Sequence, residues 1–388
     1  MKTKRLLMLI GSVCLSLVLA ALLIPACAPA APEEVVEEIA ELEEEIADLE
    51  DEVAAEKAKT AAEKAKVSDL EDEITELRAP AEVHEWKYQT YFPRATLMGE
   101  EAFVNDIETL SDGRIKVTLF AAGELIPTGE IMRAVGAGTI ELGHGSANYY
   151  PELDIGEIET GLPMAWNTSD EASLFYDDPV WRDVADEAYE ELNCHYLFTT
   201  YEAPYLILTT EPVWSLDDLR PLKLRATAAF GKMFDKVGVG SVYMPIEEVY
   251  LALSTGIIDG VLYGAAYEYS MLGFNEVATY ILGSSIINPV TGNTFISLDI
   301  WNELPDDLKA IVELSAYGQR YRYWSWVVAE DLTAKARDYV VTSLPSEDLA
   351  TLTEAALDVW DEQSAKSARC AQAVELLKEL NRSLGRLK

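Results

Sequence analysis

An arginine near the middle of the chain, Arg225, is placed where it could hold an anion. It ends the run Leu222–Arg225, in which Leu222 and Leu224 point to one face of a strand and Lys223 and Arg225 to the other. A guanidinium held at the end of a strand can bind a carboxylate through two parallel hydrogen bonds. From the spacing alone, an exposed strand arginine with no ligand is the competing interpretation.

Other side chains that could do chemistry do not form a catalytic pattern. His84, His144 and His195 are scattered without metal-ligand spacing. Glu247 and Glu248 follow a proline in the first turn of an expected helix, where acids complement the helix dipole. The sequence also lacks a nucleophile elbow, a dinucleotide fingerprint and an EF-hand loop. We therefore expect no enzyme, and a surface hydrolase is the least supported alternative.

Three segments around Arg225 resemble the solute-binding proteins of tripartite ATP-independent periplasmic (TRAP) transporters, the DctP family. They are the strand 222–225, the helix Glu248–Leu253 and the turn Gly256–Gly260, in the order and near the spacing of that family. The resemblance extends from about residue 84 into the C-terminal region and is strongest over 213–310. It implies that Arg225 pairs with a ligand carboxylate. It also implies that the chain delivers a small organic acid anion to the small and large TRAP membrane subunits.

Further candidate ligand contacts follow expected strands, because ligands of open α/β sheets bind beyond the carboxyl ends of strands. Tyr91 ends the first strand, Asn148 lies in the segment 145–149, and Trp166 lies in 162–167, which resembles a Leu-Pro-Phe segment of the family. Asn293, in a strand that returns to the first lobe, is the fourth candidate. Core burial of the aromatic residues and turn formation by Asn148 remain open as alternatives.

The sequence departs from the family at two positions that bear on the ligand. Tyr263 stands where many members have a ligand-contacting Asn or Trp, and Tyr205 stands where some have a second arginine. One arginine indicates one tightly paired carboxylate, with tyrosine contacts to hydroxyl or oxo groups. Residues 272–280 resemble the branch that binds 2-oxo acids. We expect a 2-oxo acid, a 2-hydroxy acid or a C4-dicarboxylate, with Ca²⁺ or Na⁺ as an open accompaniment and no required cofactor.

Alternating strands and helices predict the fold class. The pattern indicates strands over 84–91, 114–120, 139–143 and 290–297, and helices over 101–110, 129–135 and 306–340. This order indicates an α/β body with largely parallel sheets. The resemblance implies a two-lobed periplasmic-binding-protein fold with a hinge and long C-terminal helices. The expected ranges are 82–202 with 289–328 for lobe I, 203–288 with 329–356 for lobe II, and 357–388 for a C-terminal helix.

Composition bounds the classes of partner. The 388 residues allow two lobes with appendages, and 49% hydrophobic residues allow a sizeable core. A formal net charge of −38 argues against nucleic-acid binding and, more weakly, against docking on anionic lipid. It does not exclude an anionic ligand, because a local arginine decides binding inside a cleft.

The N-terminus has the pattern of an export signal. Lys2, Lys4 and Arg5 precede the apolar run 6–24, and the residues before Cys27 resemble a bacterial lipobox. This predicts a lipoprotein signal peptide over 1–26, lipidation of Cys27, and a location on the outer side of the cytoplasmic membrane or in the periplasm. An uncleaved anchor is the alternative, since about 19 apolar residues could span a bilayer.

Residues 27–81 are expected to form the lipid anchor site and a coiled-coil stalk. Apolar residues recur at steps of three and four at Ile39, Leu42, Ile46, Leu49 and Val53, and again at Val67, Leu70, Ile74 and Leu77. This heptad predicts a parallel two-stranded coiled coil that could pair two bodies. Its polar middle leaves a solitary helix open. The last expected helix of the body is the other candidate for pairing.

Two alternatives concern the rest of the chain. A ligand-binding sensor or adhesion protein, with the stalk as the element that binds a partner, is the second functional interpretation. Cys194 and Cys370 could pair, but two free thiols are the simpler expectation, because the sequence does not fix the connectivity.

Overall fold

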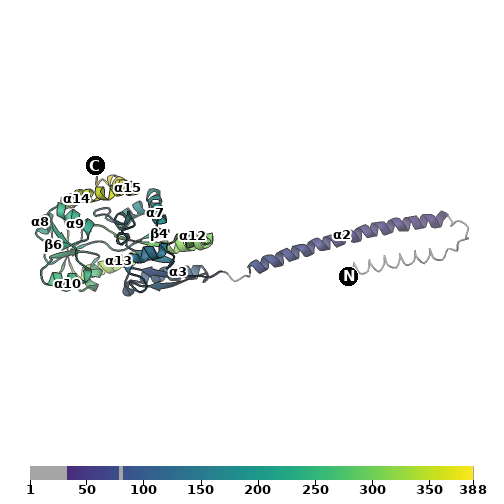
Figure 1. Cartoon of the computed structure of the whole chain (residues 1–388), viewed down its shortest axis with the longest axis horizontal. Helices are drawn as coiled ribbons and strands as arrows, with labels where there is room; N and C mark the ends of the chain where they lie inside the picture. The colour runs from purple at the N-terminus through teal and green to yellow at the C-terminus, as the bar shows by residue number, and fades with distance from the viewer. Residues whose placement is uncertain (1–32, 78–81, 388) are drawn as a thin grey trace. The chain divides into compact units, whose positions relative to one another are not determined.

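The structure is a computed structural model that describes residues 33–77 and 82–387. It divides into two units, an N-terminal helix and a body that begins at Glu82 (Figure 1). The helix α2 runs over Glu33–Leu77 without a break, so its 45 residues are roughly 68 Å long at 1.5 Å per residue. The expectation of a helix here is confirmed, whereas its pairing into a coiled coil stays a prediction. The expected signal peptide and Cys27 lie outside the described residues.

The first sheet of the body has five strands in the order β2-β1-β3-β10-β4. β1 is parallel to β2 and β3, whereas β10 is antiparallel to both of its neighbours. Four of the five strands therefore run in one direction, as expected, and β10, which returns late in the chain, is the exception. The strands are β1 (His84–Thr90), β2 (Ile115–Phe120), β3 (Leu142–Gly145), β4 (Cys194–Tyr201) and β10 (Thr291–Ser297).

The second sheet has six short strands in the order β11-β9-β5-β8-β6-β7. β6 is parallel to β7 and β8, and β11 is parallel to β9, whereas β5 is antiparallel to β8 and β9. The parallel pairing of β6 with β8 brings their carboxyl ends together. The strands are β5 (Ile207–Thr209), β6 (Lys223–Arg225), β7 (Gly240–Val242), β8 (Gly260–Leu262), β9 (Tyr280–Leu282) and β11 (Val340–Thr342).

Helices cover both sheets and enclose separate cores. α3, α12 and the start of α13 pack with Trp86 and Tyr88 on one side of the first sheet, in a cluster that includes Phe103 and Leu308. α4, α5 and α7 contribute to another cluster, which continues to the C-terminal helices. The helices are α3 (Met98–Leu110), α4 (Ile131–Gly136), α5 (Gly156–Thr160), α6 (Ser169–Tyr176), α7 (Pro179–Glu190), α8 (Leu216–Leu219), α9 (Ala228–Lys236), α10 (Ile246–Ser254), α11 (Ala266–Met271), α12 (Leu298–Glu303), α13 (Asp306–Asp338), α14 (Ser346–Ser364) and α15 (Ala368–Ser383).

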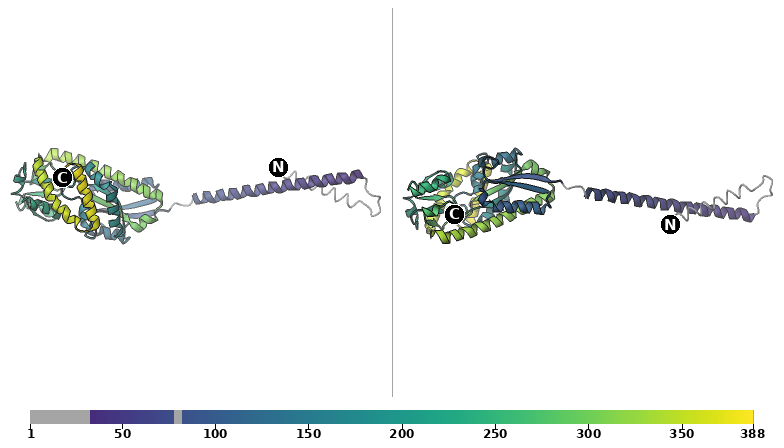
Figure 2. Two further views of the ribbon diagram at one scale, coloured as in Figure 1. Left: turned by 90° about the horizontal axis from the view of Figure 1, so that it is seen from above. Right: turned by 90° about the horizontal axis from the view of Figure 1, so that it is seen from below.

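Three stretches of chain connect the two sheets. Residues 202–206 and 286–290 run side by side, with hydrogen bonds from the Glu202 amide to the Val290 carbonyl (3.0 Å) and from the Tyr205 amide to the Ile287 carbonyl (2.9 Å). The third is α13, which contacts α3 and β4 at the first sheet and α11 and β11 at the second. Figure 2 shows α13 as one unbroken ribbon along the body.

Element boundaries differ from the expectations at two places. The strand expected over 139–143 is β3 at Leu142–Gly145, because Gly138 and Thr139 donate their amides back to the end of α4 and cannot join the sheet. The C-terminal region forms two helices, and the last begins at Ala368, where the Ser367 side chain accepts the Cys370 amide as an N-cap. Cys194 and Cys370 are both free and buried.

Candidate functional site

A cavity of about 430 Å³ lies between the two sheets of the body. Its wall comes from the loops after β1, β3 and β8, from the two connecting segments, and from α11 and α13. This volume falls within the roughly 300–1,000 Å³ typical of small-molecule pockets. The lining residues are Tyr91, Phe92, Pro93, Thr96, Thr128, Ser146, Tyr149, Thr160, Glu202, Ala203, Tyr205, Tyr263, Tyr267, Glu268, Met271, Leu272, Val290 and Tyr323.

Arg225 is buried beside this cavity at the carboxyl end of β6. Only 4% of the residue is exposed. Its Nε donates to the Met244 carbonyl (3.1 Å) and its Nη1 to the Leu262 carbonyl (3.2 Å). Its guanidinium lies over the rings of Tyr243 (5.4 Å) and Tyr263 (5.6 Å). Arg225 forms no ion pair with any residue in 37–71 or 82–387, so its charge is held by carbonyl dipoles and aromatic faces alone.

Three of the residues expected at the site line the cavity together. Tyr91 follows β1, Tyr205 lies in a connecting segment, and Tyr263 follows β8. Tyr263 also contacts the guanidinium of Arg225, so the structure brings four of the seven expected residues to one place.

The other three expected residues do not line the cavity. Trp166 is fully buried and donates its Nε1 hydrogen to the Pro289 carbonyl (2.7 Å). Asn293 is fully buried because β10 is flanked by strands on both sides, and its amide nitrogen meets the Tyr189 hydroxyl. Asn148 lies next to the cavity wall, where its amide oxygen accepts a hydrogen bond from the Ser146 hydroxyl (2.8 Å).

Sequence reasoning missed two acidic residues of the cavity wall, Glu202 and Glu268. Glu202 is 8% exposed, and one of its carboxylate oxygens accepts the Tyr91 hydroxyl hydrogen. Glu268 caps α11 by accepting the Ala265 amide (2.8 Å). Burial raises the pKa of Glu202 well above its ordinary value and the pKa of Glu268 to about 7. Neither forms an ion pair with a lysine or arginine among the described side chains.

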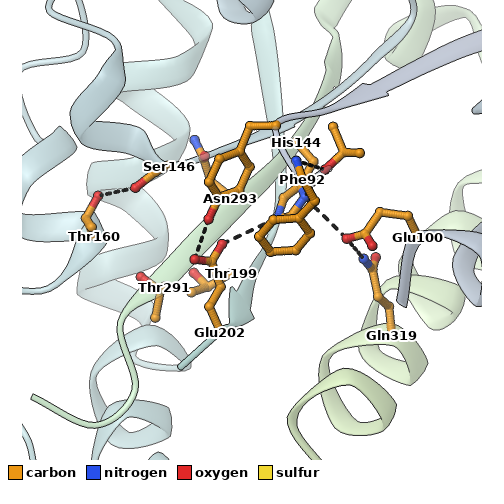
Figure 3. A network of polar contacts seen from close by, with 12 residues as sticks. Phe92, Glu100, His144, Ser146, Thr160, Thr199, Glu202, Thr291, Asn293 and Gln319 are labelled. Carbon is orange, nitrogen blue, oxygen red and sulfur yellow. Dashed lines mark hydrogen bonds and ion pairs between the residues drawn. The ribbon is translucent and has the colours of Figure 1, made fainter. Parts of the chain in front are cut away.

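A buried polar network extends from Glu202 into the first sheet (Figure 3). His144 Nε2 is 3.8 Å from Glu202 Oε1, and its Nδ1 is 2.9 Å from Thr90 Oγ1 and 3.4 Å from Glu100 Oε1. Glu100 in turn accepts a hydrogen bond from Gln319 of α13 (3.1 Å). Burial lowers the pKa of His144 to about 3 and raises the pKa of Glu100 to about 8. His144 is therefore a neutral neighbour of Glu202 at physiological pH.

The cavity is also strongly aromatic, which the sequence indicated only in part. Tyr149, Tyr267 and Tyr323 line it in addition to the three expected tyrosines. Tyr149 lies in the expected segment 145–149, whereas Tyr323 comes from α13, for which the sequence predicted a helix but no cavity contact. No group of metal-ligating side chains is present within the described parts of the chain. None of the described helices is long and apolar enough to cross a membrane.

Comparison with known proteins places these features in a family context. The family model for bacterial extracellular solute-binding proteins of family 7 (DctP) matches residues 92–367. A monocarboxylate 2-oxoacid-binding periplasmic protein of Nostoc sp. is 26% identical over 311 residues, which cover 77% of this chain and 84% of that protein.

Solved structures share the fold of the body. A TRAP periplasmic solute-binding protein from Chromohalobacter salexigens, with bound (S)-(+)-2-amino-1-propanol, has a TM-score of 0.67 and 25% identity, covering 78% of this chain and 96% of that one. Another from Pseudoalteromonas atlantica, with bound sodium and pyruvate, has a TM-score of 0.66 and 17% identity, covering 78% and 95%. The expected two-lobed α/β fold is confirmed.

Proposed function

Because the chain belongs to the DctP family, the solute-binding proteins of TRAP transporters, we propose that it captures a small organic carboxylate in the cavity and delivers it to TRAP membrane subunits. Members of this family are binding receptors of transport systems and not enzymes. The observation that carries the proposal is the buried guanidinium of Arg225, which lies against the cavity-lining Tyr263 and has no ion-pair partner in the described chain.

The proposed carboxylate pairs with Arg225. A buried cation without an anionic partner is costly, and a ligand carboxylate would supply that partner when it enters. Tyr263, Tyr91 and Tyr205 would shape the pocket around the ligand. We do not keep Trp166 and Asn293 as ligand contacts, since both are fully buried outside the cavity wall. Asn148 is kept only as a residue that holds the Ser146 hydroxyl.

The proposed ligand class is a 2-oxo acid, a 2-hydroxy acid or a C4-dicarboxylate. A single arginine supports one tightly held carboxylate, and the similar Nostoc protein is named for 2-oxo acids. Ca²⁺ or Na⁺ can accompany the ligand, but the proposal requires no cofactor.

The proposed capture step is closure of two lobes about the connecting segments. Lobe I would comprise 82–202 and 289–328, and lobe II 203–288 and 329–356. The cavity draws its wall from both, so closure would bury a ligand from two sides. The segments 202–206 and 286–290 are the natural hinge, because they are short and paired with each other.

A thermal-shift screen tests the proposal most directly. About a hundred small organic acids would be tested with and without Ca²⁺ and Na⁺. A ligand at 100 times its Kd should stabilise the fold by about 2.7 kcal/mol. A shift confined to one class of acid, lost in Arg225→Ala, supports the proposal. Folded, ligand-free protein that responds to no acid would contradict it and favour the sensor or adhesion interpretation.

We also propose that the protein is exported and lipid-anchored through Cys27, with α2 as a spacer. The family is periplasmic, and the residues around Cys27 support processing by a lipoprotein pathway. Metabolic labelling with a radioactive fatty acid should mark the wild type and not Cys27→Ala. Label on both proteins, or on neither, would rule out this anchor.

The stalk is proposed to pair two copies of the chain. Ile39, Val67 and Leu70 on its apolar stripe are 38%, 54% and 48% exposed, and a second stripe would cover them. Such a pair would present two binding bodies to the membrane subunits.

A further inference from the structure

The cavity has more acidic groups than a receptor for a simple carboxylate needs. Glu202 and Glu268 both line it, whereas the nearest cation beside it, Arg225, stacks on Tyr263. We propose that the ligand is a zwitterion of the amino-acid type, whose ammonium group is bound by Glu202 and Glu268 while its carboxylate pairs with Arg225. This inference rests on the proposed function and narrows its ligand class.

One carboxylate oxygen of Glu202 can accept a further hydrogen bond. Its Oε1 has no hydrogen-bond partner among the described residues, but it is enclosed between His144 Nε2 (3.8 Å) and the Gly292 backbone, where a Cβ would lie 2.0 Å from it, so it is closed to a ligand. Its Oε2 accepts the Tyr91 hydroxyl hydrogen. Because each carboxylate oxygen has two lone pairs, Oε2 can also accept an N–H from a ligand beside Tyr91.

Glu268, in the first turn of α11, supplies the second acceptor. Its Oε2 is fixed by the Ala265 amide at the start of α11, so the side chain has a defined direction. Its charged neighbour is Asp331, which pairs with Lys335 (2.6 Å) and therefore gives Glu268 no cation. Because Glu202 and Glu268 come from opposite parts of the wall, a bound ammonium would also tie the two parts together.

The aromatic lining can bind a cation. Six tyrosines line the cavity, and the negative faces of such rings attract ammonium groups within about 6 Å. Because tyrosine hydroxyls can also donate to an oxo group, the two glutamates decide between the ligands: ionised carboxylates only accept hydrogen bonds. The tyrosines are Tyr91, Tyr149, Tyr205, Tyr263, Tyr267 and Tyr323.

Burial raises the pKa values of both glutamates and so favours their neutral forms. An ammonium ion beside them reverses this, because an opposite charge favours the ionised carboxylate. Neutral glutamates could instead donate hydrogen bonds to a 2-oxo or 2-hydroxy acid, and this is the alternative that an experiment must separate.

Matched ligands separate the two possibilities. The full chain would be tested by thermal shift and then calorimetry against the common amino acids, with 3-amino and 4-amino acids added. The 2-hydroxy and 2-oxo acids with the same side chains would be tested in parallel. Among compounds that bind and share one side chain, we expect the amino acid to bind at least about tenfold more tightly than the 2-oxo and 2-hydroxy acids. This ratio corresponds to a difference of about 1.4 kcal/mol in binding free energy.

Variants assign the preference to the two glutamates. Glu268→Gln and Glu202→Gln should each remove most of the preference for the amino member, whereas Glu248→Gln, an exposed acid on α10, should keep it. Melting temperature and circular dichroism would confirm that the variants are folded. If loss of the Tyr91 contact unfolds Glu202→Gln, the Glu268→Gln variant still tests whether an ammonium group is bound.

The outcomes distinguish the zwitterion proposal from the proposed function on which it rests, the capture of a small organic carboxylate. If an oxo or hydroxy acid binds most tightly and Arg225→Ala weakens that binding, the proposal of a zwitterionic ligand is wrong, whereas the proposed carboxylate-binding function stands. Binding of amines that lack a carboxylate, unaffected by Arg225→Ala, would overturn the carboxylate. Absence of binding by every ligand would overturn both.

Discussion

The guanidinium of Arg225 lies 5.6 Å from the ring centre of Tyr263, and this pair joins a buried charge to the cavity wall. Arg225 belongs to β6 and Tyr263 follows β8, and these strands are parallel neighbours. The two side chains therefore meet at the carboxyl edge of the second sheet, where α/β proteins bind their ligands.

Replacement of Arg225 should weaken ligand binding strongly. We expect Arg225→Ala to cost about 2–5 kcal/mol of binding free energy, the scale for removing one partner of a desolvated charge pair. Arg225→Lys should also weaken binding, because lysine lacks the planar fork. Calorimetry with the ligand from the screen would measure both.

A matched control is Arg220→Ala in the same sheet region. Arg220 also donates to a backbone carbonyl, that of Val237 (3.1 Å), but unlike Arg225 it does not lie over a tyrosine of the cavity wall. Affinity that is unchanged in Arg225→Ala, or equally reduced in Arg220→Ala, would remove Arg225 from the site.

The buried carboxyl of Glu159 should make the stability of the fold decrease with pH. Burial raises its pKa to about 8, whereas the unfolded chain loses this proton near pH 4.3. Between these values the folded state holds the extra proton, so the free energy of unfolding falls as pH rises, by up to about 1.4 kcal/mol per unit. Glu100 acts in the same direction, and His144, with its pKa of about 3, acts oppositely only below about pH 6.5.

Denaturant unfolding between pH 6.5 and 8 would measure this slope. The Glu159→Gln side chain cannot ionise, so this variant should lose the part of the slope that the Glu159 carboxyl contributes. The matched variant Glu190→Gln, at an exposed position, should leave the slope unchanged. The same slope in Glu159→Gln and wild type would show that Glu159 ionises normally in the folded state.

Cys194 should resist thiol reagents while the protein is folded. It is fully buried, and burial raises the pKa of its thiol to about 12, so very little reactive thiolate is present at pH 8. Iodoacetamide labelling followed by peptide mass spectrometry should find this peptide unmodified until denaturant is added. Rapid labelling of the native protein would mean that β4 opens readily.

Disruption of the apolar stripe of α2 should abolish pairing of the stalk. Val67→Asp with Leu70→Asp places charges at two neighbouring core positions of the heptad, and burial of unpaired charges is prohibitive. Sedimentation equilibrium should then change from dimer to monomer. Ala62→Asp, off the stripe, should remain dimeric, and a wild type that is monomeric at every concentration would leave α2 as a solitary spacer.

In the second sheet, β6 and its arginine could be predicted because their signals are local, whereas the other five strands were not predicted. Alternation over 222–225 and the turn at 256–260 fix strand direction within a few residues, and the resemblance to the family supplied the role of Arg225. The boundary of β3 could not be predicted, because hydrogen bonds that close α4 compete for Gly138 and Thr139.

The two glutamates of the cavity wall could not be predicted from the sequence for a different reason. The chain has 68 acidic residues, and nothing in the sequence distinguishes Glu202 and Glu268 from those exposed to solvent. Their significance depends on burial and on the lack of nearby cations, which only the assembled fold determines. The predictions for Trp166 and Asn293 failed for the opposite reason: residue types that suit a ligand are fully buried in the core, where Trp166 donates to Pro289 and the Asn293 amide nitrogen meets Tyr189.

The continuity of α13 has a mechanical consequence. It contains no proline and contacts elements of both sheets over its 33 residues, so it forms one continuous helix across the body. Any change in the angle between the two sheets must therefore bend α13 or slide it along one of the sheets. The free energy needed for this bending or sliding would be subtracted from the free energy of ligand binding, so the stiffness of α13 would help to set the affinity.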